Sequence, residues 1–232
     1  MSLERAPSAS LAQPDYWWYS ARSGLLETAV SEYVGRAQRV LDVGSADGPS
    51  VEWLQVPHRV ALDIDVTALE SGDVCGSALA LPFNSASFDV VTAFDVLEHC
   101  TPEALALSEW HRVLIPGGRL LISVPAYEWA WSKFDEVAGH HRRYTRRRLC
   151  HALEAAGFRV ERCTHIFAGT LPLFAVQRLL RRIRPGEEPA VLPEVHPLID
   201  RVLLGLCRID EWLLRRGDLP CGSSVVAAAV KV

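Results

Sequence analysis

The feature that most constrains this chain is an apolar run that contains one acidic residue and is followed by two glycines. The run is Arg39-Val40-Leu41-Asp42-Val43, and Gly44 and Gly48 come soon after it. Such a run is typical of a buried parallel strand, and glycine lets the next turn pass close to a ligand. The same motif also occurs in α/β proteins that bind no cofactor. Alone, it therefore predicts a parallel α/β sheet and leaves a ligand site as one of two interpretations.

A second acidic residue favours the ligand site. Asp63 ends another apolar run and lies 21 positions after Asp42. An acid about 20 residues beyond such a turn binds ribose hydroxyls in dinucleotide sites. However, Ala46 stands where a middle glycine might be, and the carboxylate of Asp42 before the loop would repel a pyrophosphate. The pattern suits a nucleoside that carries a cation, and S-adenosylmethionine, with an ammonium and a sulfonium group, is such a ligand.

Four further motifs follow in order. They are Leu81-Pro82-Phe83 with Ser87-Phe88-Asp89-Val90-Val91, then Asp95-Val96-Leu97-Glu98-His99, then His111-Arg112-Val113-Leu114-Ile115-Pro116-Gly117-Gly118, and Leu120-Leu121-Ile122-Ser123-Val124-Pro125. Over about residues 39–163 the chain resembles the class I S-adenosylmethionine-dependent methyltransferases of the UbiE-like, methyltransferase type 11 kind. The resemblance implies S-adenosylmethionine as cofactor and S-adenosylhomocysteine as product. It also implies a Rossmann-like α/β fold with a seven-stranded sheet, mostly parallel with an antiparallel edge strand.

The hydrophobic pattern predicts where the strands lie. We expect them near residues 39–43, 59–63, 73–76, 88–93, 119–124, 158–165 and 223–231, with helices between most of them. The last two strands are expected to pair antiparallel, as the resemblance implies.

The chain is expected to form one methyltransferase domain over residues 15–232, after a disordered N-terminus at residues 1–14 that is rich in Ala, Ser and Pro. Within it, residues 15–38 are expected to form a lid helix that begins with four aromatic residues. Residues 169–222 are expected to form a helical cap inserted before the last strand, with amphipathic segments at 171–184 and 198–215. Two interpretations of the cap stay open: packing on the sheet, or peripheral docking on an anionic membrane or a lipid-linked acceptor.

Composition limits the class of protein. The 232 residues are 49% hydrophobic, enough for a sizeable core, and a net charge of −4 gives no reason to expect a nucleic-acid partner. The six cysteines are scattered, which favours reduced thiols and a cytoplasmic protein. We expect no signal peptide and no membrane span, since no apolar stretch reaches 18 residues.

The resemblance also implies a set of cofactor-binding residues. Asp42 would organise the loop near the ammonium group, and Asp63 can accept from both ribose hydroxyls. Ser77 falls where the family typically has an adenine-binding Asp, and Asp73 is the competing alignment. Only 14 positions separate Asp63 from Ser77, so the intervening helix must be short or missing. The full predicted set is Asp42, Gly44, Ser45, Ala46, Asp63, Ile64, Ser77, Ala78 and Asp95.

Catalytic candidates are the histidines His99, His140 and His141, because an imidazole titrates near neutral pH. In-line methyl transfer needs a base only when the acceptor is a weak acid. The predicted acceptor-binding residues follow the fifth strand, and arginine there would suit an acceptor phosphate or carboxylate. They are Tyr127, Trp131, Arg143 and Tyr144. No His/Cys cluster has ligand spacing, so no metal site is expected.

The predicted function is methyl transfer from S-adenosylmethionine to a small-molecule or lipid-linked acceptor. The alternative is a non-catalytic module that keeps the cofactor fold and regulates a partner, suggested by Ala46 and Ser77. A nicotinamide oxidoreductase is disfavoured by the acid before Gly44 and by the absence of a third glycine. Nucleic-acid methylation is disfavoured because the chain has no Asn/Asp-Pro-Pro-Tyr block. The sequence leaves the methylated atom and the oligomeric state open.

Overall fold

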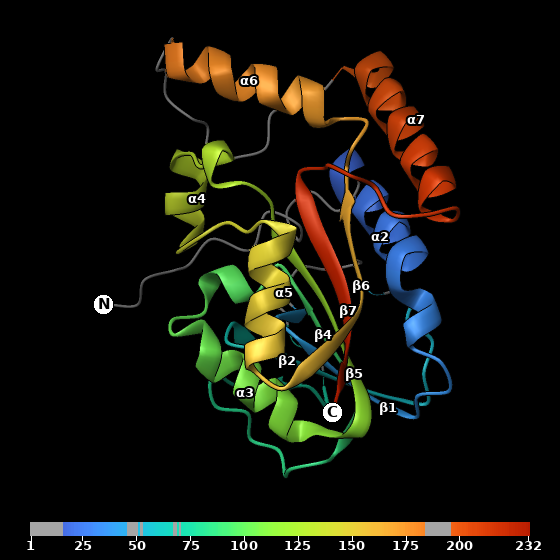
Figure 1. The fold of residues 1–232 in the computed structure, drawn as a ribbon, viewed down its shortest axis with the longest axis vertical. Coiled ribbons are helices and arrows are strands. Elements are labelled where there is room, and N and C mark those ends of the chain that lie inside the picture. Colours follow the sequence, from blue (N-terminus) through green and yellow to red (C-terminus); the bar gives the residue numbers. More distant parts are fainter. Residues whose placement is uncertain (1–15, 46–50, 52, 67–68, 70, 184–195) are drawn as a thin grey trace.

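The computed structural model describes residues 16–45, 51, 53–66, 69, 71–183 and 196–232 (Figure 1). Its strands are β1 (Arg39–Val43), β2 (His58–Asp63), β3 (Val74–Cys75), β4 (Phe88–Phe94), β5 (Leu114–Pro125), β6 (Phe158–Ile166) and β7 (Ser224–Lys231). Its α-helices are α2 (Trp17–Val30), α3 (Glu103–Val113), α4 (Lys133–Ala138), α5 (Arg146–Ala155), α6 (Leu171–Ile183) and α7 (Pro197–Leu214). Short 3-10 helices are η1 (Ser31–Tyr33), η5 (Leu97–His99) and η6 (Glu128–Ala130).

The described strands form one sheet in the order β3-β2-β1-β4-β5-β7-β6. All neighbours are parallel except that β7 runs antiparallel to both β5 and β6. The predicted α/β fold with a mostly parallel seven-stranded sheet is confirmed, including the antiparallel pairing of the last two strands. Within that fold the antiparallel strand lies one position in from the edge, and β6 is the edge strand itself.

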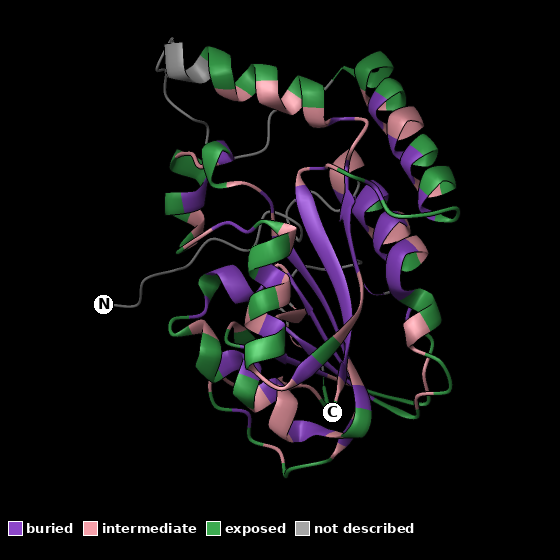
Figure 2. Cartoon of the chain, viewed as in Figure 1, coloured by how far each residue is buried: buried purple, intermediate pink, exposed green. Residues whose placement is uncertain are grey.

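Buried residues run along the strands and along the helices that cover the sheet (Figure 2). Their side chains form two core layers, one on each face of the sheet. In β1, Leu41 belongs to the layer covered by α3 and α5, whereas its neighbour Val40 belongs to the layer covered by α2 and α7. Trp110 of α3 is fully buried in the first layer, and Leu25 of α2 is fully buried in the second. Because β1 has helices on both sides, its run of apolar residues shows little polar alternation.

The segment between β2 and β3 is unusually short, and its described residues contain no α-helix. Residues 67, 68 and 70 of this segment lie outside the described residues, so the short or missing helix stays a prediction. The first 14 residues, expected to be disordered, lie outside the described residues.

The insertion between β6 and β7 contains α6 and α7, with bounds close to the predicted amphipathic segments. One face of α7 packs on α2, where a side chain at Gly24 would collide with Glu211 at 2.6 Å. Asp210 fixes the start of the insertion because both its carboxylate oxygens accept from the Gly169 N–H, at 3.1 and 3.0 Å. In Figure 1, α6 stands above the sheet while α7 continues the layer formed by α2. None of the described helices is long and apolar enough to cross a membrane.

Candidate functional site

Unusual backbone conformations gather where four parallel strands end. Gly44, Asp95, Tyr127 and Phe167 follow β1, β4, β5 and β6, with φ of 72°, 58°, 61° and 64°. For residues other than glycine, this left-handed region costs about 1–3 kcal/mol and persists where the surrounding structure enforces it, often at functional sites. Ligands of open α/β sheets bind at the carboxyl ends of the strands. This edge is therefore the candidate site.

The first turn of the site is built around Gly44. Its N–H donates to the Leu62 carbonyl at 2.8 Å, and a Cβ at this position would lie 2.3 Å from a methyl group of Val96. Only glycine fits both the positive φ and this close approach. The predicted cofactor residue Ala46 lies outside the described residues.

Asp42 ties this turn to both neighbouring strands. Its buried carboxylate accepts from Arg59 Nη2 at 2.7 Å and from Thr92 Oγ1 at 2.6 Å. The same Arg59 nitrogen donates to Ser45 Oγ at 3.1 Å. Asp42 therefore supports the loop through β2 and β4, which is the geometry that its predicted organising role needs.

Asp63 ends β2 at the same edge. The residue is 8% exposed, and its Oδ1 accepts from the Asp65 N–H at 2.8 Å. Its carbonyl accepts from the Gly76 N–H at 2.9 Å, which brings the turn after β3 beside it. The side chain of the predicted residue Ile64 points to solvent, with 68% of its surface exposed.

The structure separates the two alignments proposed for the adenine-binding position. Asp73 precedes β3, and its carboxylate accepts from the Ala61 N–H in the middle of β2 at 3.2 Å. Ser77 follows β3 at the carboxyl edge, where its hydroxyl accepts from the Leu79 N–H at 3.2 Å. Ala78, next to it, packs against the core. The position at the edge is therefore Ser77.

Asp95 stands directly after β4, in the centre of the edge. Its carboxylate accepts from Ser123 Oγ at 2.9 Å and forms an ion pair of 2.9 Å with Arg22. Arg22 comes from α2, is 1% exposed and lies over the ring of Trp18 at 5.4 Å. Sequence reasoning did not single out Arg22, since the aromatic residues dominate that helix in the sequence.

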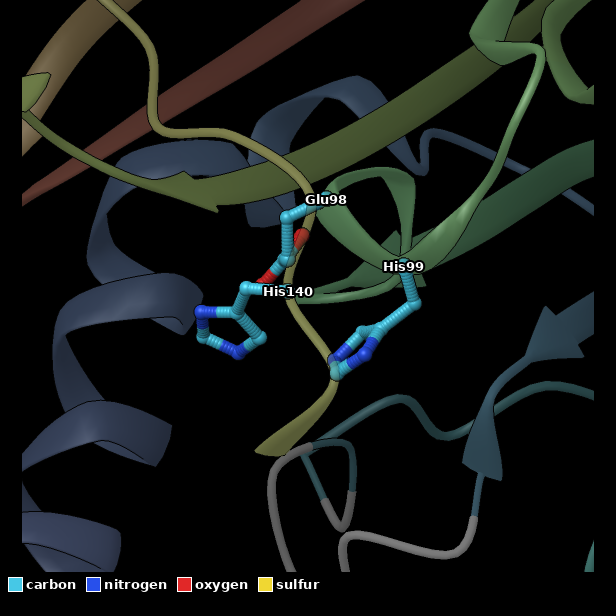
Figure 3. Close-up of side chains that lie close together, drawn as sticks. All are labelled: Glu98, His99 and His140. Carbon is cyan, nitrogen blue, oxygen red and sulfur yellow. The ribbon is translucent and has the colours of Figure 1, made fainter. Parts of the chain in front are cut away.

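Three side chains meet beyond the end of β4: Glu98, His99 and His140 (Figure 3). We call them the EHH cluster. Each offers a ligand atom, and these atoms all lie within 4.8 Å of one another. Glu98 and His99 belong to η5, whereas His140 follows α4. The two imidazole rings meet edge to face, with centroids 4.7 Å apart. Glu98 has no exposed surface, His140 is half-buried and His99 keeps an exposed side.

The protein environment lowers the pKa of His99 to about 4. Partial burial of the imidazole ring is the main cause, because it disfavours the charged form. Electrostatic repulsion from His140 lowers the pKa of His99 further. The imidazole of His99 is therefore neutral at physiological pH.

Asp135 orients His140. Its Oδ1 lies 2.8 Å from His140 Nδ1, and the guanidinium of Arg143 donates to both carboxylate oxygens at 2.8 and 3.0 Å. Burial alone would raise the pKa of Asp135, but the hydrogen bonds from His140 and Arg143 hold it well below its usual range. Ser132 and Asp135 form a capping box at the start of α4, which fixes the carboxylate on the helix.

Two predicted acceptor-binding residues have other partners. Arg143 is 6% exposed, and its remaining donor reaches the Ala126 carbonyl at 3.1 Å. Tyr144 is fully buried and donates its hydroxyl to Glu103 Oε2 at 2.6 Å. Both side chains are held by acidic groups of the chain itself, and their contact with an acceptor stays a prediction. His141, a predicted catalytic residue, has an exposed side chain outside the EHH cluster, and only its backbone N–H reaches Glu98, at 2.8 Å to the carbonyl.

The other two predicted acceptor residues lie after β5. Tyr127 stacks between Trp129 and His165, with ring centroids 5.6 and 5.7 Å away, and its hydroxyl lies 3.3 Å from His165 Nε2. Trp131 follows η6 and is half-buried. Trp129 also contacts Phe174 of α6, with ring centroids 6.4 Å apart. This aromatic wall is therefore continuous with the inserted helices.

Four residues of the site were missed as candidates: Arg22, Glu98, Asp135 and His165. Glu98 stands inside a motif that carries the family resemblance, so a signal was present without an assigned role. His165 lies within the predicted sixth strand, where nothing distinguishes it from an ordinary strand residue.

Comparison with known proteins shows what the chain resembles. A model described as "Methyltransferase domain" matches residues 41–122. A protein of Mycolicibacterium smegmatis, described as a probable S-adenosylmethionine-dependent methyltransferase, is 29% identical over 171 residues, 68% of this chain and 65% of the relative. A demethylmenaquinone methyltransferase of Mycobacterium tuberculosis is 36% identical over 123 residues, 49% of each chain. A malonyl-[acyl-carrier protein] O-methyltransferase of Herminiimonas arsenicoxydans is 41% identical over 140 residues, 53% of this chain and 54% of the relative. The chain thus spans about half to two thirds of the length of these relatives.

Solved structures show the same fold. The [4+2]-cyclase SpnF has a TM-score of 0.60 at 21% identity, over 98% of this chain and 84% of its own. An S-adenosylmethionine-dependent methyltransferase of Thermotoga maritima has a TM-score of 0.59 at 19% identity, over 96% of this chain and 97% of its own. The chain has the fold of the class I S-adenosylmethionine-dependent methyltransferases, with its candidate site at the carboxyl edge of the sheet, and over residues 41–122 it matches the methyltransferase domain family.

Proposed function

We propose that this protein transfers a methyl group from S-adenosylmethionine to a small-molecule or lipid-linked acceptor. The observation that carries the proposal is the placement of Gly44, Asp63 and Asp95 at the carboxyl ends of three neighbouring strands, β1, β2 and β4. A nucleoside with an amino-acid arm needs three features side by side along the sheet edge: a turn that approaches it closely, a carboxylate that accepts hydrogen bonds from the ribose hydroxyls, and charged groups for the arm.

Each part of the cofactor has complementary groups along this edge. We assign the ribose hydroxyls to Asp63 and the adenine to the turn of Ser77 and Ala78, with Ile64 covering the outer side. The methionine arm carries both a carboxylate and an ammonium group, and the Arg22–Asp95 pair presents both opposite charges. Asp42, Gly44 and Ser45 would lie beneath this arm.

The reaction is an in-line displacement. A lone pair of the acceptor forms the new bond to the methyl carbon, and the electron pair of the broken C–S bond stays on sulfur, which gives neutral S-adenosylhomocysteine. Alignment supplies much of the rate enhancement, and an acceptor proton must leave when the acceptor is weakly acidic. We assign assistance with that loss to His99, which lies near Asp95, and to His140, whose ring contacts that of His99.

Calorimetric titration tests the cofactor site. We expect wild-type protein to bind S-adenosylmethionine and S-adenosylhomocysteine, and Asp63→Ala to lose that binding. Asp65→Ala is the matched control, because Asp65 lies two positions further on and should leave the affinity nearly unchanged. No binding by folded wild-type protein would contradict the proposal.

Relatives suggest which acceptors to assay first. The matched proteins are named for demethylmenaquinone and for malonyl-[acyl-carrier protein], so a quinone and a carrier-linked carboxylic acid form the starting panel. Formation of S-adenosylhomocysteine with either acceptor would define the class. It would also eliminate the alternative of a non-catalytic module, which Ala46 and Ser77 suggest.

The inserted helices support the lipid-linked form of the proposal. Their exposed apolar side chains include Leu173, Val176, Leu179 and Leu180 on α6, and Leu198, Ile199, Val202 and Ile209 on α7. Exposed arginines accompany them on and just after α7, at positions 201, 208, 215 and 216. Such a surface suits an anionic bilayer, and Phe174 connects it to the aromatic wall of the site.

Vesicle co-sedimentation separates the lipid-linked acceptor from a soluble one. We expect binding to vesicles that contain anionic phospholipid, and loss of that binding in Leu180→Glu combined with Val202→Glu. Leu105→Glu on α3 is the control, because Leu105 is also an exposed apolar residue, at 45%, but lies away from the insertion. Equal sedimentation with neutral and anionic vesicles, or none, would favour a soluble acceptor.

The six cysteines are free thiols, which supports a cytoplasmic location.

A further inference from the structure

We propose that Glu98, His99 and His140 bind one divalent transition-metal ion, for which Zn²⁺ is the probe. Their ligand atoms come from two segments, η5 and the turn after α4, and lie within 4.8 Å of one another. Figure 3 shows the three side chains converging on one region beside the end of β4. No metal site was expected from the sequence, because no His/Cys cluster has ligand spacing. His99 and His140 are 41 positions apart, and only the fold brings them together.

The donor set has the chemistry of a catalytic rather than a structural metal site. Two imidazole nitrogens and one carboxylate oxygen hold Zn²⁺ in enzymes that keep the fourth position for substrate. Ligand atoms about 2.1 Å from a tetrahedral ion lie about 3.4 Å apart, so the cluster must close by roughly 1 Å. His99 keeps an exposed side, which leaves its ring room to rotate.

A surrounding shell already orients His140 as a metal ligand. Asp135 engages Nδ1, which leaves Nε2, on the other side of the ring, as the nitrogen available to a metal. Arg143 grips both oxygens of Asp135, and Gly139 ends α4 in the left-handed conformation directly before His140. A carboxylate that holds the second nitrogen of a ligating histidine is the usual arrangement at metal sites.

The consequence for catalysis rests on the proposed function. An acceptor oxygen or nitrogen at the remaining coordination position would lose its proton to water more readily, because the ion stabilises the negative charge that remains. The lone pair left on that atom then forms the bond to the methyl carbon. His99 and His140 would in that case act as ligands and not as proton acceptors.

The test is a metal titration of the full chain after removal of any affinity tag and of bound metal with a chelator. We expect one Zn²⁺ per chain with a Kd that is roughly micromolar or lower, and visible absorption bands when Co²⁺ replaces Zn²⁺. His99→Ala and His140→Ala should each weaken binding by about 100-fold or more, since loss of an outer partner alone typically costs 10- to 100-fold. Glu98→Gln keeps the side-chain shape and should also weaken binding.

His141→Ala is the matched control, because this neighbouring histidine is exposed and lies outside the EHH cluster. It should bind Zn²⁺ like the wild type. Wild-type protein that binds no Zn²⁺, or equal losses in His140→Ala and His141→Ala, would overturn the proposal. Titration of the same metal-free samples with S-adenosylmethionine checks that each variant is folded. Cofactor binding without Zn²⁺ binding would remove the metal site alone, and Zn²⁺ binding without cofactor binding would remove the methyltransferase proposal alone.

Discussion

The guanidinium of Arg22, on the N-terminal helix α2, forms an ion pair of 2.9 Å with the carboxylate of Asp95 at the end of β4. The contact joins residues that are far apart in the sequence and places a positive charge in the centre of the candidate site. Because Arg22 is 1% exposed, the pair also anchors α2 on the sheet. The helix that the sequence suggests as a lid is therefore anchored to the site by a buried charge.

Replacing Arg22 should cost both stability and cofactor affinity. Removing one partner of a buried ion pair typically costs 3–5 kcal/mol, and we expect about 2 kcal/mol here because Asp95 keeps 19% of its side chain exposed. Urea denaturation of Arg22→Met gives the loss in free energy of unfolding. In the double variant Arg22→Met/Asp95→Asn the loss should shrink, since the unpaired carboxylate is gone; strictly additive losses would contradict the pairing.

Gly44→Ala should destabilise the first turn more than the same change at Gly35. Both glycines have positive φ, 72° and 59°, but only at Gly44 would the new methyl group meet a neighbour, Val96 at 2.3 Å. We expect about 1 kcal/mol for the strain at Gly35 and about 2–3 kcal/mol at Gly44, with weaker S-adenosylmethionine binding in that variant alone. Thermal denaturation and calorimetry measure both effects. Equal losses at the two positions would show that Val96 does not restrict the turn.

Tyr144→Phe should affect stability and not acceptor binding. The change removes the 2.6 Å hydrogen bond to Glu103, which Arg142 and Arg148 still approach at 3.5 and 3.8 Å. The expected loss in free energy of unfolding is about 1 kcal/mol. Once an acceptor is known, its KM should stay within about twofold of the wild-type value; a large rise in KM with unchanged stability would restore Tyr144 as a binding residue.

Stability should fall as the pH drops below about 6.5, with His165 as one cause. Burial lowers the pKa of His165, and the charge of Arg146 lowers it further, against the opposing effect of the Leu219 carbonyl. As the pH falls, His165 therefore takes up a proton in the unfolded chain before it does so in the folded chain. The contribution of His165 to stability is complete above its pKa in the unfolded chain, and it is lost as the pH falls towards its pKa in the folded chain. His111, whose pKa is also lowered, acts in the same direction.

Melting temperatures between about pH 7.5 and pH 5 measure this dependence. The fall should be smaller in His165→Gln than in the wild type. His151→Gln is the control, because His151 is exposed on α5, and it should keep the wild-type slope. A slope that is unchanged in His165→Gln would show that the buried imidazole does not contribute.

Local patterns in the sequence were enough to predict the strands and the inserted helices. β1 was predicted at its observed bounds, and the amphipathic segments 171–184 and 198–215 differ by one residue at most from α6 and α7. Apolar runs and helical periodicity depend on neighbouring residues, so they can be read without knowing the fold. The positions of Asp42 and Asp63 follow from the strand ends in the same way.

The side-chain partners could not be predicted, because they depend on contacts between distant segments. Arg143 was expected to bind an acceptor as part of a basic run, but Asp135 occupies its guanidinium. Glu98 and His99 meet His140 only after β4 and the turn beyond α4 reach the same edge of the sheet. The charges of such residues are visible in the sequence, whereas the group that neutralises each charge is not.

The position of β7 has a consequence for how the chain reaches its native state. This strand lies between β5 and β6, yet it follows both of them, and the whole insertion, in the chain. Until it arrives, β5 keeps one edge of unpaired amide groups open and β6 has no strand partner on either side, and such edges are templates for association between chains. Completing the sheet also requires closing a long loop, and such long-range pairing is slow. We therefore expect a late folding intermediate with exposed strand edges, whose aggregation during synthesis or refolding a chaperone would limit.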